Sequence, residues 1–238
     1  MHKFTLLIVA AGNSSRFKWN IAPKQYCLLG NHNILCSTIN NMISHPKISY
    51  VKVVIRKEHQ HLYSSSLPKH DKLLPPAYGG ARRQDSVRIG LESLQDINPH
   101  FVIIHDACRP FVDLKLLDTM EPILNHYVGV VPVLSITDTV HMVYEDNTVM
   151  KNIDRNTIKL VQTPQAYKYS DILLYHKTAY DTDPYNEFPD ESSLMLYYNI
   201  PIMTIKGDYN NFKITTIEDL HRAISYIQYT NKITSFKQ

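Results

Sequence analysis

Small residues and two cations follow an apolar run near the start of the sequence, within residues 7–26. The run ends at Gly12, and Arg16 and Lys24 come after it. A strand that ends in such a turn presents backbone N–H groups to phosphate oxygens, and nearby cations can stabilise the charge that builds up when a phosphorus is attacked. The turn is neither a Walker A loop nor a GxGxxG fingerprint, because no Gly-Lys-Ser/Thr follows and Ser14 and Arg16 stand where further glycines would be needed. It therefore predicts a cradle for a nucleoside triphosphate, with an ordinary strand-to-helix turn as the alternative.

Two further groups of residues follow predicted strands. In GGARRQDSV, residues 79–87, paired glycines allow the backbone to approach a ligand, and Ser86 falls in the first turn of the next helix. In HDACRP, residues 105–110, Asp106 and Arg109 come directly after an apolar run. Asp106 could hold a divalent cation or accept a hydrogen bond from a hydroxyl, and the planar guanidinium suits a phosphate. A plain turn and a structural ion pair are the respective alternatives.

Apolar runs rich in β-branched residues alternate with segments of helical spacing. These runs are residues 4–9, 50–55, 101–104, 128–134 and 202–205. Short, nearly continuous apolar strands that alternate with helices predict an α/β fold, with a mostly parallel, Rossmann-like sheet and helices on both faces. We expect residues 1–238 to form a single domain. Ligands then belong at the carboxyl ends of the strands, where the groups described above would gather.

One segment breaks this alternation. Residues 139–153 have two extended halves around Glu145, Asp146 and Asn147, which predicts a β-hairpin arm over about residues 137–158. Because an isolated hairpin is marginally stable in water, we expect the arm to lie on a second subunit and the chain to form a homodimer. The last helix, which carries an apolar stripe, is expected to pack back on the sheet.

Composition narrows the class of protein. The 25 basic and 22 acidic residues give a net charge of +3, so there is no broad basic surface field and we expect no nucleic-acid partner. No run reaches the roughly 18 apolar residues of a membrane span, so no membrane partner is expected. The three cysteines lack the spacing of a zinc site or a CxxC motif, and the 12 histidines show no metal-binding spacing. We therefore expect a cytoplasmic enzyme from a reducing compartment.

Eight motifs occur in a recognisable order: AAGNSSR, PKQY, GGARRQDSV, HDACRP, the Asp-Thr pair at 138–139, IDRN, QTPQ and NFKIT. With them the chain resembles the 2-C-methyl-D-erythritol 4-phosphate cytidylyltransferases of the non-mevalonate isoprenoid pathway, over about residues 4–224. The resemblance implies a nucleotidyltransferase that joins CTP and 2-C-methyl-D-erythritol 4-phosphate to give 4-diphosphocytidyl-2-C-methyl-D-erythritol and pyrophosphate. It also implies Mg²⁺, held mainly by the CTP phosphates, with no certain protein ligand.

The resemblance assigns roles to residues at the matching positions. The CTP site would be lined by the backbone of Ala10, Ala11 and Gly12. The cytosine and ribose would be held by Gly80, Ala81 and Ser86. The transition state would be stabilised by Arg16 and Lys24. The polyol phosphate would be surrounded by Asp106, Arg109, Thr139, Arg155, Thr163 and Lys213. Of these, Arg155 and Lys213 would position it for attack, and because the family's arm crosses to a neighbouring subunit, Thr139 and Arg155 would complete the partner's site.

The chain departs from the family pattern at four positions, which put fine substrate contacts in doubt. These are Ser14 (often glycine), Ala81 (often polar), His141 (where lysine is expected) and Pro189 (in place of the first residue of TDDAS). The charged residues that the chemistry requires are all present. Two alternatives stay open: a ribitol-5-phosphate cytidylyltransferase, and a non-catalytic nucleotide-binding protein of the same fold.

Overall fold

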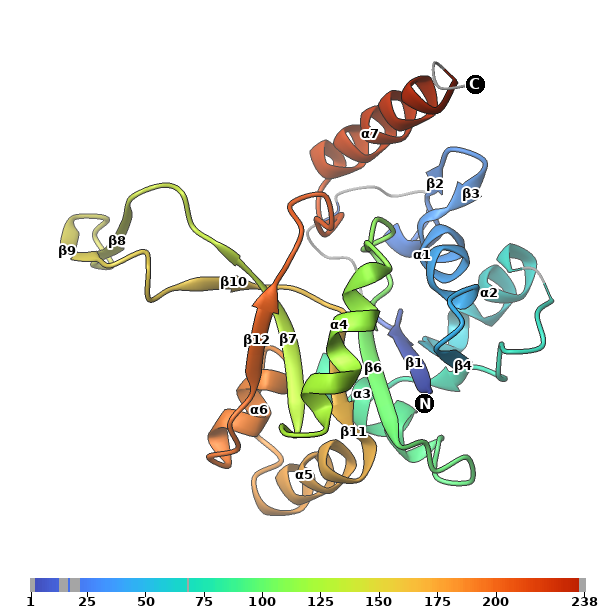
Figure 1. Ribbon diagram of the computed structural model, residues 1–238, viewed down its shortest axis with the longest axis horizontal. Helices are drawn as coiled ribbons and strands as arrows, with labels where there is room; N and C mark the ends of the chain where they lie inside the picture. Colours follow the sequence, from blue (N-terminus) through green and yellow to red (C-terminus); the bar gives the residue numbers. More distant parts are fainter. Residues whose placement is uncertain (1–2, 13–16, 18–21, 68, 236–238) are drawn as a thin grey trace.

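The computed structural model describes residues 3–12, 17, 22–67 and 69–235, with side chains up to residue 230. Within these residues the main sheet has eight strands (Figure 1). They are β1 (Phe4–Val9), β4 (Ile48–Ile55), β5 (Ala77–Tyr78), β6 (Phe101–Asp106), β7 (Gly129–Ser135), β10 (Lys159–Val161), β11 (Gln165–Lys168) and β12 (Met203–Lys206). Seven of them follow the order β10-β7-β11-β6-β1-β4-β5, and β12 pairs with β7.

The sheet is parallel in the half that contains β1. Strand β1 pairs in parallel with β4 and β6, and β5 adds to β4 in parallel. Strand β11 runs antiparallel between β6 and β7, while β7 also pairs in parallel with β12 and antiparallel with β10. The predicted mostly parallel sheet is confirmed, and β11 is a strand that the sequence analysis did not predict.

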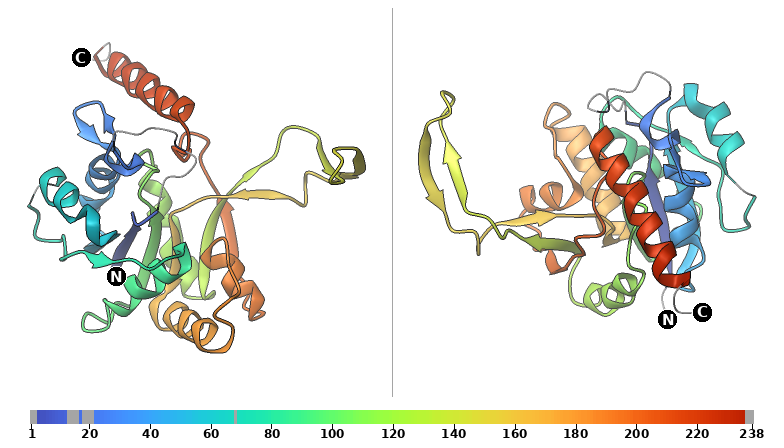
Figure 2. Two further views of the ribbon diagram at one scale, coloured as in Figure 1. Left: turned by 180° about the vertical axis from the view of Figure 1, so that it is seen from behind. Right: turned by 90° about the horizontal axis from the view of Figure 1, so that it is seen from above.

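Helices cover both faces of the sheet, as predicted (Figure 2). One face carries α1 (Ile34–Ile43), α2 (Gln60–Ser66) and α4 (Lys115–Leu124). The other carries α3 (Arg83–Glu92), α5 (Tyr169–Thr182) and α6 (Glu191–Tyr197). Along β1 the side chains alternate, so that Leu6 and Ile8 face the first layer and Leu7 faces the second. The short turns η1 (Lys24–Tyr26) and η2 (Lys57–His59), with the hairpin of β2 (Leu28–Leu29) and β3 (His32–Asn33), lie in the connections.

Helix α3 lies unusually close to the sheet at Gly90. A Cβ atom placed on Gly90 would lie 2.7 Å from Leu7 Cδ1 and 2.7 Å from Val54 Cγ2. No real side chain tolerates this spacing without a shift of its neighbours, so the absence of a side chain sets how closely α3 packs on β1 and β4. The same helix carries Arg83 and Ser86 in its first turn.

The predicted arm is present as a hairpin that extends away from the rest of the chain (Figure 1). Its strands are β8 (Val140–Val143) and β9 (Val149–Ile153), which pair antiparallel. At the turn, Asp146 Oδ1 accepts hydrogen bonds from the N–H and the hydroxyl of Thr148 at 2.9 and 2.7 Å, and Asn147 adopts a positive φ of 67°. The hairpin is confirmed, while the expected second subunit stays a prediction.

The last helix, α7 (Ile217–Ser235), does not pack on the sheet, so that prediction is wrong. Its apolar side chains join a separate cluster with Leu29, Ile34 and Ile214. The helix projects from the edge of the molecule near β2 and β3 (Figure 1). The faces of the main sheet are already covered by the helices of the two layers, so α7 buries its stripe against β2, the start of α1 and the neighbouring loops instead. None of the described helices is both long and apolar enough to cross a bilayer.

Candidate active site

A cavity of about 300 Å³ opens at the carboxyl ends of β1 and β6. This is where an open α/β sheet binds its ligands. The predicted site residues that line it are Ala10, Ala11, Gly12, Lys24, Gly80, Ala81, Ser86, Asp106 and Lys213. Lys24 and Lys213, 189 positions apart in the chain, therefore line the same cavity. Arg16 and Ser14 lie outside the described residues.

The loop that carries Lys24 is tied to the end of β1 by its neighbour Gln25. The Gln25 amide Nε2 donates to the Ala10 carbonyl at 2.7 Å, and the side chain is only 3% exposed. Pro23, with φ −58°, immediately precedes the short turn η1 that contains both residues. Gln25 is thus a positioning residue that was not predicted from the sequence. The feature that could have indicated it is a polar side chain next to an apolar segment in the PKQY motif.

The glycine pair ahead of α3 allows neighbouring segments to pack closely, and neither glycine adopts a positive φ. A Cβ atom on Gly79 would lie 2.6 Å from Ala11 Cβ and 2.6 Å from Ser86 Oγ. Gly79 therefore lets the turn before α3 pack against the end of β1, while Gly80 lines the cavity. The buried Ser86 hydroxyl donates to the Arg82 carbonyl at 3.1 Å, which leaves its oxygen able to accept a hydrogen bond from a ligand.

A second cavity, of about 420 Å³, adjoins the first. Three residues line both cavities and form a wall between them: Arg83, Asp106 and Lys213. The predicted residues Arg109 and Thr163 line the second cavity, as does Pro189. The two cavities thus meet at one carboxylate and its cations.

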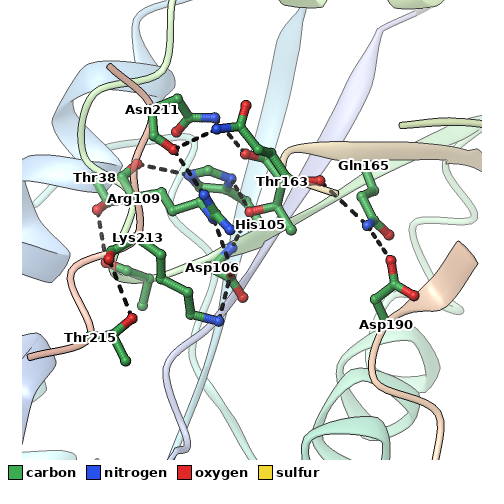
Figure 3. A network of polar contacts seen from close by, with 12 residues as sticks. Thr38, His105, Asp106, Arg109, Thr163, Gln165, Asp190, Asn211, Lys213 and Thr215 are labelled. Atoms are coloured by element: carbon green, nitrogen blue, oxygen red, sulfur yellow. Dashed lines mark hydrogen bonds and ion pairs between the residues drawn. The ribbon is translucent and has the colours of Figure 1, made fainter. Parts of the chain in front are cut away.

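Asp106 brings Arg109 and Lys213 together (Figure 3). Its Oδ2 lies 3.0 Å from Arg109 Nε and 3.0 Å from Lys213 Nζ, while Arg83 Nε lies 3.9 Å from Oδ1. Burial alone would raise the pKa of the Asp106 carboxyl, but the positive charges of Lys213, Arg83 and Arg109 outweigh burial and hold this pKa well below its usual range. The carboxylate therefore stays ionised throughout the pH range in which the protein would work.

A buried histidine fixes the hydroxyl beside Asp106. The His105 ring lies 3.0 Å from the Arg109 carbonyl through Nε2 and 3.0 Å from Thr163 Oγ1 through Nδ1. Burial lowers the pKa of His105 to about 4, so the ring is neutral. Because a carbonyl can only accept, Nε2 carries the proton and Nδ1 accepts from the Thr163 hydroxyl. That hydroxyl oxygen in turn accepts the Asp106 N–H at 3.0 Å. Thr163, predicted to contact the substrate, therefore donates its proton to His105 and holds the Asp106 backbone through its oxygen.

The loop that carries Lys213 is fastened to the same strand end. Asn211, 1% exposed, donates through Nδ2 to the Thr163 carbonyl at 2.8 Å, and its own carbonyl accepts from Arg109 Nη1 at 2.8 Å. The Ile214 N–H donates to the Cys108 carbonyl at 2.9 Å. Lys213 lies between these two attachments, which explains how a residue near the end of the chain reaches Asp106 (Figure 3).

Two predicted residues are not brought to the cavities within this chain. Thr139 and Arg155 are exposed at the base of the arm and line neither cavity. The Arg155 guanidinium donates to the Thr137 carbonyl across the base of the arm. His141, one of the departures from the family pattern, is also exposed on the arm.

The described residues offer no protein-built metal centre. No group of three or more His, Cys, Asp or Glu side chains that could hold a metal ion occurs in the described part of the chain. Among the described residues that line the first cavity, Asp106 is the one carboxylate, and its oxygens already face three cations. The donor set therefore suits a metal ion that arrives on phosphate oxygens.

Comparison with known proteins places this arrangement in a family. The profile of IspD, 2-C-methyl-D-erythritol 4-phosphate cytidylyltransferase, matches residues 4–229. A bifunctional enzyme IspD/IspF from Wolbachia pipientis wMel is 42% identical over 226 residues, which cover 93% of this chain and 55% of that protein. This chain spans about half the length of the curated relatives it matches.

Solved structures agree with the sequence match. The 4-diphosphocytidyl-2C-methyl-D-erythritol synthase of Anaerococcus prevotii superposes with a TM-score of 0.82 at 25% identity, over 95% of this chain and 96% of that one. The 2-C-methyl-D-erythritol 4-phosphate cytidylyltransferase of Francisella tularensis gives 0.79 at 27% identity, over 93% and 98%. Since the profile match, the identity and the fold agree, this chain belongs to the IspD family of 2-C-methyl-D-erythritol 4-phosphate cytidylyltransferases.

Proposed function

We propose that this chain transfers the cytidylyl group of CTP to 2-C-methyl-D-erythritol 4-phosphate. An oxygen of the polyol phosphate forms a bond to the α-phosphorus of CTP, and the bond from that phosphorus to the oxygen bridging to the β-phosphate breaks. The products are 4-diphosphocytidyl-2-C-methyl-D-erythritol and pyrophosphate. The family to which the chain belongs supports this choice of substrates.

The observation that carries the proposal is the wall between the two cavities. One cavity is lined by small residues and backbone at the end of β1, which suits a nucleotide, and the other is lined by polar groups around Arg109. Lys213 and Asp106 border both. A nucleophile in the second cavity and a triphosphate in the first would therefore meet beside Lys213, with Lys24 lining the nucleotide side.

The chemistry needs charge neutralisation more than proton transfer. A phosphate monoester has a second pKa of about 6, so it is mostly dianionic at neutral pH and attacks without a general base. Two polyanions repel each other, and preorganised cations offset that repulsion at the α-phosphorus. We assign this role to Lys24, Lys213 and, from the family resemblance, Arg16.

We propose Mg²⁺ as the counter-ion of the triphosphate. When bound, Mg²⁺ would neutralise negative charge on the phosphate oxygens and favour departure of pyrophosphate. Asp106 is the residue that could approach it, while the phosphate oxygens and water would supply most ligands. This division agrees with a cavity whose described lining offers one carboxylate.

We further propose a homodimer in which the arm reaches a second copy of the chain. The arm exposes apolar side chains, including Val143 at 52% and Val149 at 60%, and it carries Thr139 and Arg155 away from the cavities of its own chain. Burial of this apolar surface against a second copy would stabilise the hairpin. The same contact would deliver Thr139 and Arg155 to the partner's polyol phosphate.

A cytoplasmic location completes the proposal. Cys27, Cys36 and Cys108 are all free and buried, and burial raises the pKa of the Cys108 thiol to about 11. Three unpaired cysteines suit a reducing compartment.

Pyrophosphate release tests the function. Purified protein is incubated with CTP, Mg²⁺ and either 2-C-methyl-D-erythritol 4-phosphate or ribitol 5-phosphate, and pyrophosphate is measured with time. We expect release with the methylerythritol substrate at a much higher kcat/KM. A higher kcat/KM with ribitol 5-phosphate would assign the chain to that activity instead, and CTP binding without release with either would indicate a non-catalytic nucleotide-binding protein.

A further inference from the structure

Arg83 is the one residue of the wall between the cavities to which neither the motifs nor the resemblance gave a role. It is the first residue of α3 and lines both cavities. Its neighbour Arg82, which precedes the same helix, pairs with Asp85 and donates to the Pro184 carbonyl. The Nε atom of Arg83 instead lies 3.9 Å from Asp106 Oδ1.

Glu191 holds the Arg83 side chain in a two-point ion pair. Arg83 Nη1 donates to Glu191 Oε1 at 2.8 Å, and Nη2 donates to Oε2 at 3.0 Å. Glu191 is the first residue of α6 and only 1% exposed. A planar guanidinium held at both Nη atoms keeps a fixed orientation, so its Nε side faces Asp106. The position of the Arg83 guanidinium is thus determined by α3, which carries it, and by α6, which carries Glu191; both helices lie on the same face of the sheet.

The two oxygens of Asp106 have different partners. Oδ2 accepts from Arg109 and lies 3.0 Å from Lys213 Nζ, whereas Oδ1 lies 3.9 Å from Arg83 Nε. Rotation of a carboxylate about χ2 is soft, and both contacts at 3.0 Å fall on the same oxygen, Oδ2. Arg83 therefore provides the constraint on the Oδ1 side.

We propose that Arg83, oriented by Glu191, is a positioning residue for cytidylyl transfer: it fixes Asp106 so that Oδ2 holds Lys213 at the wall between the nucleotide and polyol phosphate cavities. The inference rests on the proposed function, because it concerns the same reaction. It adds that the first residues of α3 and α6, Arg83 and Glu191, set the position of the Lys213 ammonium. Misplacement of a reacting group by about 1 Å can slow turnover by about 100-fold.

The test compares Arg83→Lys with the matched control Arg88→Lys. Lysine keeps the positive charge that buried Glu191 needs, but one ammonium cannot hold both Glu191 oxygens and face Asp106 in a fixed direction. Arg88 lies on the same helix, pairs with Glu92 at 2.8 Å and stacks on Tyr180, and it lines neither cavity. Both variants lose a guanidinium that pairs with a glutamate of the protein, but Glu191 is 1% exposed and Glu92 is 31% exposed, so the melting temperature of each variant is measured as well.

For Arg83→Lys we expect kcat to fall by about 10- to 100-fold, with the KM for CTP changed by less than about 3-fold. On an Asp106→Asn background the same substitution should change kcat by less than about 2-fold, because its effect passes through Asp106. Arg88→Lys should leave kcat near the wild-type value. If Arg83 acts through its charge alone, Arg83→Lys should leave kcat unchanged. If its role is merely structural, the melting temperature should fall and kcat should drop by the same factor on the wild-type and Asp106→Asn backgrounds. Either result overturns the proposal.

A second measurement does not depend on turnover. Acylation of Lys213 by an amine-reactive ester, followed by mass spectrometry of the folded protein, reports how firmly its ammonium is held. We expect faster acylation of Lys213 in Arg83→Lys than in the wild type or Arg88→Lys. If the wild type releases no pyrophosphate, the proposed function fails while this labelling still tests the link from Arg83 to Lys213. Unchanged labelling in an active wild-type protein refutes the positioning role alone.

Discussion

Replacement of Lys213 by methionine separates catalysis from folding. Lys213 lines both cavities, and its ammonium lies 3.0 Å from Asp106 Oδ2. Methionine keeps much of the length and the apolar stem but removes the positive charge beside the proposed position of the α-phosphorus. Loss of one preorganised charge-stabilising group costs roughly 100- to 1000-fold in kcat elsewhere, and we expect a loss of that order here.

The same substitution should cost little folding stability. Asp106 keeps Arg109 at 3.0 Å and Arg83 at 3.9 Å, so its carboxylate is not left unpaired. The Lys213 side chain is 35% exposed, and solvent screens an ion pair in such a position, so we expect a loss of about 1 kcal/mol or less. For a chain of this size that corresponds to a fall in melting temperature of roughly 2–4 °C or less.

The assay measures pyrophosphate release, CTP affinity by calorimetry and the melting temperature on the same preparation. Lys213→Arg serves as the control that keeps the charge, and it should retain more activity than Lys213→Met. The reasoning is refuted if Lys213→Met keeps kcat within about 3-fold of the wild type, since a transition-state group cannot be lost at so small a cost. It is equally refuted if activity falls only in proportion to unfolded protein.

Three other predictions concern the arm, the buried His105 and the close packing of α3 on the sheet. If the arm acts on the partner, a mixture of the inactive variants Arg155→Ala and Lys213→Met should regain roughly a quarter of wild-type activity, because about half of random dimers are mixed and each holds one intact site; a mixture as inactive as its components would contradict the exchange. Because the folded pKa of His105, about 4, lies below the unfolded value, the unfolded chain binds more protons between these values. Stability that is complete above pH 6.5 should therefore fall by roughly 3 kcal/mol as the pH drops to about 4, as measured by urea unfolding; a flat profile that His105→Gln leaves unaltered would contradict this assignment. Gly90→Ala should lower stability by about 1–3 kcal/mol, since its Cβ would meet Leu7; an unchanged melting temperature would show that α3 can shift at no cost.

The strands buried on both faces were the part of the fold most readable from the sequence. β1 has the predicted bounds, and β4 and β6 differ from the predicted runs by two residues at one end. Their apolar runs are continuous because helices cover both sides. β11 escaped prediction because its four residues, Gln165–Lys168, show no such run. Its extended form depends on hydrogen bonds to β6 and β7, which are distant in sequence.

Motif order also predicted most of the charged residues of the candidate site, but not their supporting partners. Asp106, Lys213 and Lys24 line one cavity, while the roles that the resemblance implied for them stay predictions. Gln25 and His105 lie inside quoted motifs, yet their roles come from hydrogen bonds to a strand end and to Thr163. Such partners are set by where the backbone passes, which a local pattern does not record.

The sequence by itself determined the alternation of strands and helices, the hairpin arm and the residue types available for phosphate chemistry, because these depend on local periodicity and side-chain chemistry. Only the tertiary structure decided that α7 packs on β2 and the start of α1 rather than on the main sheet, and that Arg83 pairs with Glu191, 108 positions away. The physical reason is that ion pairs and packing depend on distance in space. Distances between remote segments are set by the whole set of sheet pairings and helix contacts.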